Sequence, residues 1–208
     1  LLAALVLGAA YRRRFSGFLP GGAGRLWGGV LTGLCLFGGY VFQTLGLRLT
    51  TPSKSAFLTG LAIPLVPLLA SLFWRIPPKL SELAGVAVAT AGMALMTLPG
   101  GSAGINVGDL LTLGAAFFFA LHLLAVGHFS PRDGFERLSV LQVTAVAVLS
   151  LASFWWAETM FVNWSYTLLA AIAVTALMAT AAALTVQAWA QRHTSFTRTA
   201  VIFAAEPV

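Results

Sequence analysis

Two stretches of the sequence carry the same order of amide, hydroxyl and cationic side chains, and these are the first candidates for solute recognition. The stretches span residues 43–56 and 187–200, an offset of 144. Gln, Arg, Thr and Ala recur unchanged at four positions, and four further positions exchange Ser with Thr or Lys with Arg. Amides and hydroxyls both donate and accept hydrogen bonds. An internal duplication explains the match, and chance similarity is the alternative because only short stretches can be compared.

Glutamines inside apolar segments are the strongest candidates for lining a solute path. Gln43 is the one strongly polar side chain deep in the second half of segment 26–47. Its counterpart Gln187 shares a segment with Thr180 and Gln191, and the spacings of seven and four residues place these three side chains on one helical face. The functional interpretation is a hydrogen-bonding lining for a polar metabolite. The alternative is that these groups lie at the membrane interface or join neighbouring helices, at about 0.6 kcal/mol per bond.

Further candidates lie close to these glutamines in the sequence. Ser55 and Thr59 stand four residues apart at the start of the next apolar segment, and Trp189 adjoins the second copy of the repeated stretch, where it would flank the path. Helical Ser and Thr also bond their own backbone, so a structural role for both hydroxyls stays open. Pro64 and Pro67 free backbone carbonyls in mid-segment, which either opens the helix beside a cavity or produces a kink of purely structural use.

Two ionisable side chains lie within apolar segments, apart from Cys35 and residues at segment edges. A carboxylate at mid-bilayer costs about 2.5–3.5 kcal/mol, so Glu206 is expected to face a cavity or a partner. The hypothesis is that Glu206 binds a cationic group or takes up a proton that couples solute export to the proton gradient. The alternative is a neutral or water-reaching carboxylate held by the Glu-Pro geometry. His122 follows three phenylalanines, which favours a neutral packing histidine over a proton relay.

The sequence contains little that indicates a catalytic site or a metal site. The segment 100–104 fits the nucleophile-elbow pattern, and Asp109 and His122 follow it, but it lies in a polar loop rather than between a strand and a helix. His122 would also lie about 20 Å along the next helix from Asp109. A single cysteine, Cys35, excludes an intramolecular disulfide and a cysteine metal cluster. The sequence therefore predicts no enzyme, no metal site and no cofactor.

The composition places these residues in a membrane protein. Apolar residues make up 59% and charged residues 9% of the chain, against about 25% charged in a soluble domain. The net charge of +6 comes from cations in short loops, so topology explains it better than nucleic-acid binding. Six segments are long enough to cross the bilayer as helices, and two partial ones stand at the ends, of which the first has a signal-peptide core as its alternative. The complete segments are 26–47, 55–74, 83–99, 109–129, 138–157 and 166–190, and the partial ones are 1–10 and 199–208.

The loops between these segments alternate in charge. With the first loop in the cytoplasm, ten of the twelve Lys and Arg residues fall on that side, and only Arg48 and Lys54 fall on the other. The positive-inside rule therefore sets the orientation. The two copies of the repeated stretch then face opposite ways, because five spans separate them. Inverted repeats recur in secondary transporters, where one half moves against the other around a site near the midplane.

Several runs of residues resemble the EamA-type transporters of the drug/metabolite transporter superfamily. The runs are 42–47, 55–61, Pro64 and Pro67 in the first half, and 108–111, 118–122, 188–192 and 205–208 in the second half. The likeness covers nearly the whole chain, although its motifs are diffuse. It implies an all-α bundle of ten membrane helices in two inverted repeats of five, with both termini in the cytoplasm. Residues 1–99 would form the first repeat and residues 100–208 the second, with the second helix of the family at 1–10 and the ninth opening at 199.

The predicted function is secondary transport of small polar metabolites or drugs across the cell (inner) membrane, in the direction of export. A membrane-embedded enzyme is one alternative, disfavoured because no reactive side chains converge within the spans. A non-transporting scaffold is the other, disfavoured because packing alone does not require inverted repeats with paired polar residues. The expected partners are a small-molecule substrate, the lipid bilayer and, under the coupling hypothesis, protons. Nucleic acid is not expected, a homodimer stays open, and the sequence does not specify the substrate, the direction of transport or the coupling ion.

Overall fold

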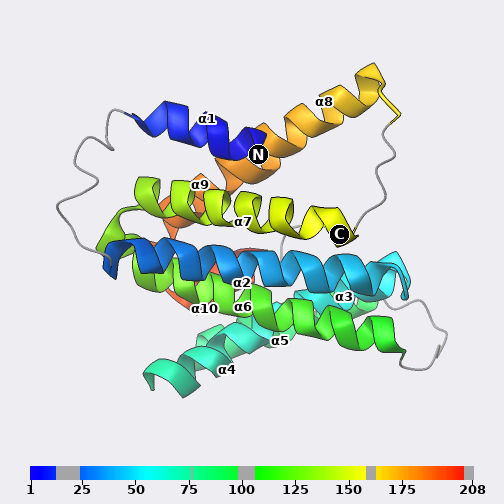
Figure 1. The fold of residues 1–208 in the computed structure, drawn as a ribbon. Helices are drawn as coiled ribbons and strands as arrows, with labels where there is room; N and C mark the ends of the chain where they lie inside the picture. The colour runs from blue at the N-terminus through cyan, green and yellow to red at the C-terminus, as the bar shows by residue number, and fades with distance from the viewer. Residues whose placement is uncertain (13–23, 76, 98–105, 158–162, 204–208) are drawn as a thin grey trace. The chain divides into compact units, whose positions relative to one another are not determined.

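The computed structural model describes residues 1–12, 24–75, 77–97, 106–157 and 163–203. Within these ranges every regular element is a helix (Figure 1). Lipid offers no hydrogen bonds to the backbone, so apolar segments of this length pair their own N–H and C=O groups as helices. The helices are α1 (Leu2–Tyr11), α2 (Gly24–Leu47), α3 (Pro52–Gly60), α4 (Ala62–Trp74), α5 (Leu80–Thr97), α6 (Val107–Asp133), α7 (Phe135–Ala157), α8 (Tyr166–Val174), the π-helix η2 (Thr175–Ala182), α9 (Ala183–Ala190) and α10 (Phe196–Phe203).

Five stretches of these helices are long and apolar enough to cross a membrane. They match five of the six complete segments predicted above, so the protein is a multi-pass, helical membrane protein. The sixth predicted segment, 83–99, is helical as α5 up to Thr97, but its last residues and several of its side chains lie outside the described part of the chain. The shorter apolar helix α1 covers the first partial segment. The five stretches are Leu26–Leu47, Pro52–Trp74, Val107–Asp133, Phe135–Phe154 and Tyr166–Ala190.

The chain packs as two compact units, each built from both halves of the sequence. The first unit comprises Leu1–Phe37 and His128–His193, and the second comprises Gly38–Gly127 with the segment that begins at Thr194. In the first unit, α1 packs on α7 and η2, and α7 packs on α9. In the second unit, α10 packs on α4 and α5, and α3 packs on α5. The predicted repeats, 1–99 and 100–208, stay a prediction.

The core of the second unit is formed by small and branched apolar side chains of α4, α5, α6 and α10. Val66 of α4, Ala116 and Ala120 of α6, and Ala200 of α10 are completely buried. Alanines on α6 and α10 allow the neighbouring helices to approach closely, and the larger Leu and Ile side chains fill the space between them. This packing holds the first turns of α5, α6 and α10, which carry the polar groups described below.

The second span, Pro52–Trp74, is interrupted rather than continuous. Helix α3 ends at Gly60 and α4 begins at Ala62, and the N–H of Leu61 donates to the carbonyl of Leu58 at 3.1 Å. Pro64 has no N–H to donate to the carbonyl of Gly60, one turn earlier. The distortion predicted from the prolines is thus a break one turn before Pro64. Pro67, by contrast, is buried inside a helix that continues.

The last span contains a π-helix that the sequence did not indicate. Residues Thr175–Ala182 form η2 between α8 and α9. The hydroxyl of Thr180 donates to the carbonyl of Thr175, five residues earlier, at 3.0 Å. π-helices are rare and usually only one turn long. The apolar pattern that predicts the span is compatible with either helix type, so it carries no sign of the wider turn.

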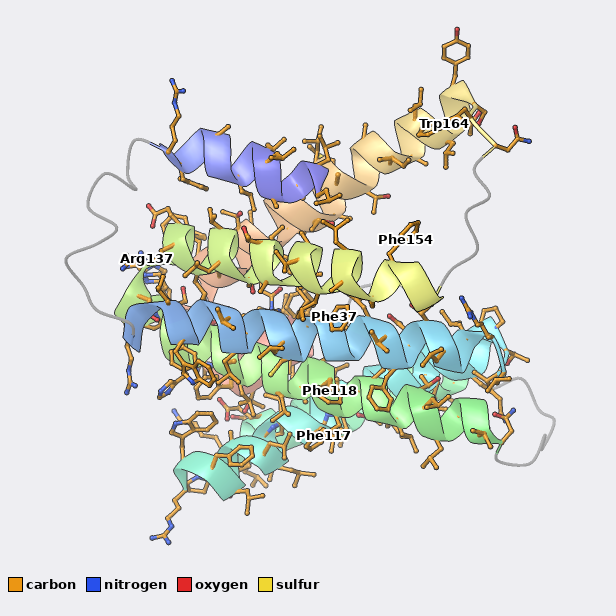
Figure 2. The ribbon with its side chains drawn as sticks, viewed as in Figure 1. Phe37, Phe117, Phe118, Arg137, Phe154 and Trp164 are labelled. Atoms are coloured by element: carbon orange, nitrogen blue, oxygen red, sulfur yellow. The ribbon has the colours of Figure 1, made fainter. Side chains whose placement is uncertain are left out.

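Glycines let helix α2 approach its neighbours closely. In the first unit, a Cβ on Gly33 would lie 2.6 Å from Cβ of Ala145 and 2.8 Å from the carbonyl oxygen of Gln142, both on α7. Gly29 and Gly33 form a Gly-x-x-x-Gly pattern, and such a pattern allows the close helix packing found here. In the second unit, Phe42 of α2 stacks on Phe118 of α6, with ring centroids 5.3 Å apart (Phe118 is labelled in Figure 2).

Candidate functional site

The two copies of the repeated stretch begin their second helices with the same cap. The N–H of Lys54 donates to the side-chain oxygen of Thr51 at 3.4 Å, at the start of α3. The N–H of Arg198 donates to the side-chain oxygen of Ser195 at 3.3 Å, at the start of α10. Both members of the second pair lie 144 residues after their counterparts. A hydroxyl at the N-cap accepts this bond because the first N–H groups of a helix have no partner within the helix.

The turns that follow the preceding helices share one backbone hydrogen bond. The N–H of Leu49 donates to the carbonyl of Gly46 at 2.9 Å, after the end of α2. The N–H of His193 donates to the carbonyl of Ala190 at 2.9 Å, after the end of α9. The same offset of 144 relates these two bonds. The resemblance seen in side-chain types therefore extends to the backbone of both hairpins.

Gln43 and Thr59, both predicted to face a solute, lie in contact within the second unit. The amide nitrogen of Gln43 on α2 is 3.4 Å from the hydroxyl oxygen of Thr59 on α3. Both side chains are half-buried. Thr59 precedes the helix break at Leu61, so the pair lies beside backbone that is not fully used in helical hydrogen bonds. An amide and a hydroxyl each offer hydrogen-bond donors and acceptors without a fixed charge.

Ser55 is one turn before Thr59 and is almost completely buried. Its side chain is 1% exposed, and its hydroxyl has no hydrogen-bond partner among the described residues. A helical serine commonly donates to the carbonyl one turn earlier, as Thr32 does to the carbonyl of Gly28, but the hydroxyl of Ser55 makes no such bond. A buried hydroxyl without a partner costs free energy. Ser55 is therefore a polar group that a solute or a rearranged helix would satisfy.

An ion pair that the sequence analysis missed joins the α2–α3 loop to the start of α6. The ammonium of Lys54 lies 2.8 Å from Oδ2 of Asp109, and the hydroxyl of Thr50 donates to the other carboxylate oxygen. Asp109 also caps its own helix, since Oδ2 accepts the N–H of Asn106 at 3.1 Å and the N–H of Asp109 donates to Asn106 at 2.9 Å. The reciprocal cap Asn-x-x-Asp before an apolar run is the sequence signal for this role.

The candidates predicted on the last span occupy different surroundings within the first unit. Thr180 bonds its own backbone and lines an apolar cavity of about 830 Å³ between α1, α7, α8 and η2. Gln187 is half-buried, and Trp189 is 51% exposed with its ring against His193. Gln191 follows the end of α9, is 3% exposed, and has no side-chain hydrogen bond within the described residues.

Gln142 on α7 is a second buried amide, and the sequence analysis did not select it. Its side chain is fully buried, and neither amide atom has a partner in the described part of the chain. Gln142 is the one amide in the predicted segment 138–157. The criterion that selected Gln43, a lone amide deep in an apolar segment, would therefore have found it.

Of the two ionisable candidates, the structure describes His122 but not Glu206. His122 on α6 is 3% exposed and lies between residues of the apolar core of the second unit, next to Leu123 and Leu124. This position agrees with a packing role and leaves the proton relay as a hypothesis. Glu206 lies outside the described residues. Among the residues that are described, no three His, Cys, Asp or Glu side chains gather as a metal site would require.

Comparisons with known proteins indicate the class of this chain. It is 31% identical over 180 residues to a protein of Archaeoglobus fulgidus named "uncharacterized transporter", and the match covers 86% of this chain and 57% of that relative. The chain thus spans little more than half of the relative's length. It also resembles a protein of known crystal structure, with a TM-score of 0.78 and 19% identity over 98% of this chain and 71% of the other, which shows a shared fold. No protein-family profile matches the chain.

Proposed function

We propose that the protein is a secondary transporter that exports small polar solutes across the cell membrane by alternating access. The observation that carries the proposal is the pair of interhelical loops that share a backbone bond and a cap hydrogen bond at an offset of 144 residues. Five predicted spans separate the hairpins, so they would enter the membrane from opposite sides, as inverted repeats of transporters do. The name of the Archaeoglobus fulgidus relative supports the same class of function. An EamA-type arrangement with repeats at 1–99 and 100–208 accounts for the duplication.

The residues proposed to contact the solute are mainly neutral polar groups, and each predicted repeat supplies some of them. Gln43 and Thr59 contribute the contact in the first repeat, with Ser55 one turn away. The second repeat contributes the last-span candidates Thr180, Gln187, Trp189 and Gln191. Amides and hydroxyls offer donors and acceptors without a fixed charge. Solutes with several hydrogen-bonding groups are therefore the expected class, in preference to apolar compounds or simple ions.

Transport by the protein in proteoliposomes tests this function directly. We expect a screen of polar metabolites under an imposed pH gradient to identify a solute class that moves, and Gln43→Ala and Thr59→Val each to reduce its initial rate about tenfold, as loss of one well-placed hydrogen bond does. Thr44→Val is the matched control, because Thr44 neighbours Gln43 but is exposed on α2. If no solute moves although the protein is folded and correctly oriented, the transport function is contradicted. The alternatives of a membrane-embedded enzyme or a non-transporting scaffold would then be favoured.

Proton coupling is the second part of the proposal. If Glu206 takes up the coupling proton, Glu206→Gln leaves an amide that cannot ionise, and uptake driven by a pH gradient should fall to the level of passive exchange. Exchange of labelled for unlabelled solute at equal pH should persist in this variant, because exchange requires no net proton movement. Unchanged gradient-driven transport with unchanged pH dependence in Glu206→Gln would exclude this role for Glu206 and transfer it to another group.

A further inference from the structure

Two carboxylates in the second unit each join the first turn of their own helix to the hairpin in front of another helix. Asp109 accepts the N–H of Asn106 at the start of α6 and pairs with Lys54 and Thr50 of the α2–α3 loop. Glu82 does the equivalent at the start of α5. Its Oε2 accepts the N–H of Lys79 at 3.2 Å, and its Oε1 accepts the hydroxyl of Ser195 at 3.1 Å. We call Thr50, Lys54 and Asp109 the outer clasp, and Glu82 and Ser195 the inner clasp.

The two clasps lie at opposite ends of the second unit. Glu82 is in the first turn of α5, a helix of 18 residues and therefore about 27 Å long. Asp109 is in the first turn of α6, the helix that follows α5 in the chain. In Figure 1, α3 and the start of α6 share one end of this unit. In the orientation predicted from the loop charges, the outer clasp faces the exterior and the inner clasp faces the cytoplasm.

Each clasp can release its loop without unfolding a helix. Oδ2 of Asp109 keeps the N–H of Asn106, and Oε2 of Glu82 keeps the N–H of Lys79, when the loop moves away. The released groups can reach water, since the side chain of Lys54 is 20% exposed and Ser195 is exposed. Each carboxylate thus keeps the bond that caps its own helix, while water can replace its bond to the loop. A closure that opens and closes reversibly requires this combination.

Next to each clasp in the sequence is a buried hydroxyl, at equivalent positions of the repeat. Ser55 follows the outer clasp and is 1% exposed, and Thr199, 144 residues later, follows the inner clasp and is 6% exposed. Access of water to these two residues therefore reports on the opening of the neighbouring clasp.

We propose that the outer and inner clasps are the two gates of alternating access, an inference that rests on the transport function proposed above. The outer clasp contains a charge-assisted bond to a side chain that is only 5% exposed, whereas the inner clasp is a hydroxyl–carboxylate bond at the surface. Both contacts are charge-assisted, but the outer clasp joins two opposite charges and a hydroxyl at a carboxylate with little access to water, which makes it the stronger of the two. The inner clasp therefore opens more readily than the outer clasp. Opening of the outer clasp is the step that releases a solute to the exterior.

Side-specific cysteine labelling tests the proposal without any solute. In a Cys35→Ala background, Ser55→Cys and Thr199→Cys each provide one buried thiol, and a membrane-impermeant maleimide is applied to one face of proteoliposomes. Asp109→Asn should raise labelling of Ser55→Cys from the outer face at least about tenfold, as expected for the loss of a bond to a charged group. It should leave Thr199→Cys unchanged. Glu82→Gln should produce the reverse pattern from the inner face, with a smaller increase.

The controls separate gating from general loosening. Asparagine keeps an oxygen for the cap of α6, and Lys54→Gln provides a second route to the same loss if Asp109→Asn folds poorly. Lys54→Arg should restore protection, and Arg198→Gln, which removes the cation at the equivalent position of the repeat, should leave Ser55→Cys protected from the outer face. The Lys54→Gln/Asp109→Asn double variant should label no faster than the faster single variant. Equal increases at both cysteines, or none at either, would overturn the gating role. Side-specific labelling in a protein that moves no solute would refute transport alone.

Discussion

Replacing Gly108 by alanine is expected to lower the free energy of unfolding by about 2 kcal/mol, because overpacking a close contact typically costs 1–3 kcal/mol. A Cβ at this position would lie 2.7 Å from the carbonyl carbon of Leu49 and 2.8 Å from the carbonyl oxygen of Gly46. Both neighbours are backbone atoms, so no side-chain rotation relieves the clash. The start of α6 and the end of α2 would have to separate, which would also strain the pairing of Lys54 with Asp109.

Denaturant unfolding in detergent measures this loss, and Gly85→Ala is the matched control. A Cβ on Gly85 would meet only the side chain of Val201, at 3.7 Å, which is ordinary van der Waals contact. Alanine is favoured over glycine inside a helix by roughly 0.5–1 kcal/mol, so this variant should be neutral or more stable. Equal stability of the Gly108→Ala and Gly85→Ala proteins would show that the α2–α6 contact is not as tight as the structure describes.

Replacing Gln142 by methionine is expected to raise the free energy of unfolding by about 1–2 kcal/mol. Gln142 is fully buried, and its amide has no hydrogen-bond partner within the described residues. Methionine has nearly the same length and flexibility, and it removes a desolvated polar group of the kind that costs about 1–3 kcal/mol when unsatisfied. The same denaturant experiment measures the gain, and the transport assay shows whether the amide is retained for function.

Gln43→Met controls for the substitution itself. The amide of Gln43 donates to Thr59, so its removal should be neutral or should destabilise the protein by roughly 0.6 kcal/mol. A protein stabilised by Gln142→Met but slowed in transport would place Gln142 on the solute path. Destabilisation by Gln142→Met would instead reveal a polar partner for that amide and remove it from consideration.

The membrane helices could be predicted closely because strong physical signals bound them. The span Leu26–Leu47 stops where Arg48 begins, and Tyr166–Ala190 coincides with the segment predicted from apolarity alone. Charged side chains cannot enter the hydrocarbon cheaply, so their positions mark the ends of spans. The proline signal was also informative, although it predicted a distortion without locating the break at Leu61.

The arrangement of the polar groups could be predicted only in part. Gln43 and Thr59 were selected individually, but their contact joins two helices and depends on the loop between them. The pairing of Lys54 with Asp109 joins residues 55 positions apart, which spacing along one helix cannot indicate. The π-helix had a similar effect, because the shared face assigned to Thr180, Gln187 and Gln191 assumes α-helical periodicity throughout. Tertiary packing, which one sequence does not display, decides each of these features.

The caps of α3 and α10 join residues only three positions apart, and this locality has a consequence for how such a protein inserts. Bonds from Lys54 to Thr51 and from Arg198 to Ser195 form in the same way whichever side of the bilayer the loop occupies. The choice of side depends instead on the number of Lys and Arg residues in each loop. The cap bonds of these loops are therefore compatible with either direction through the membrane, and the loop cations alone have to differ between the two directions.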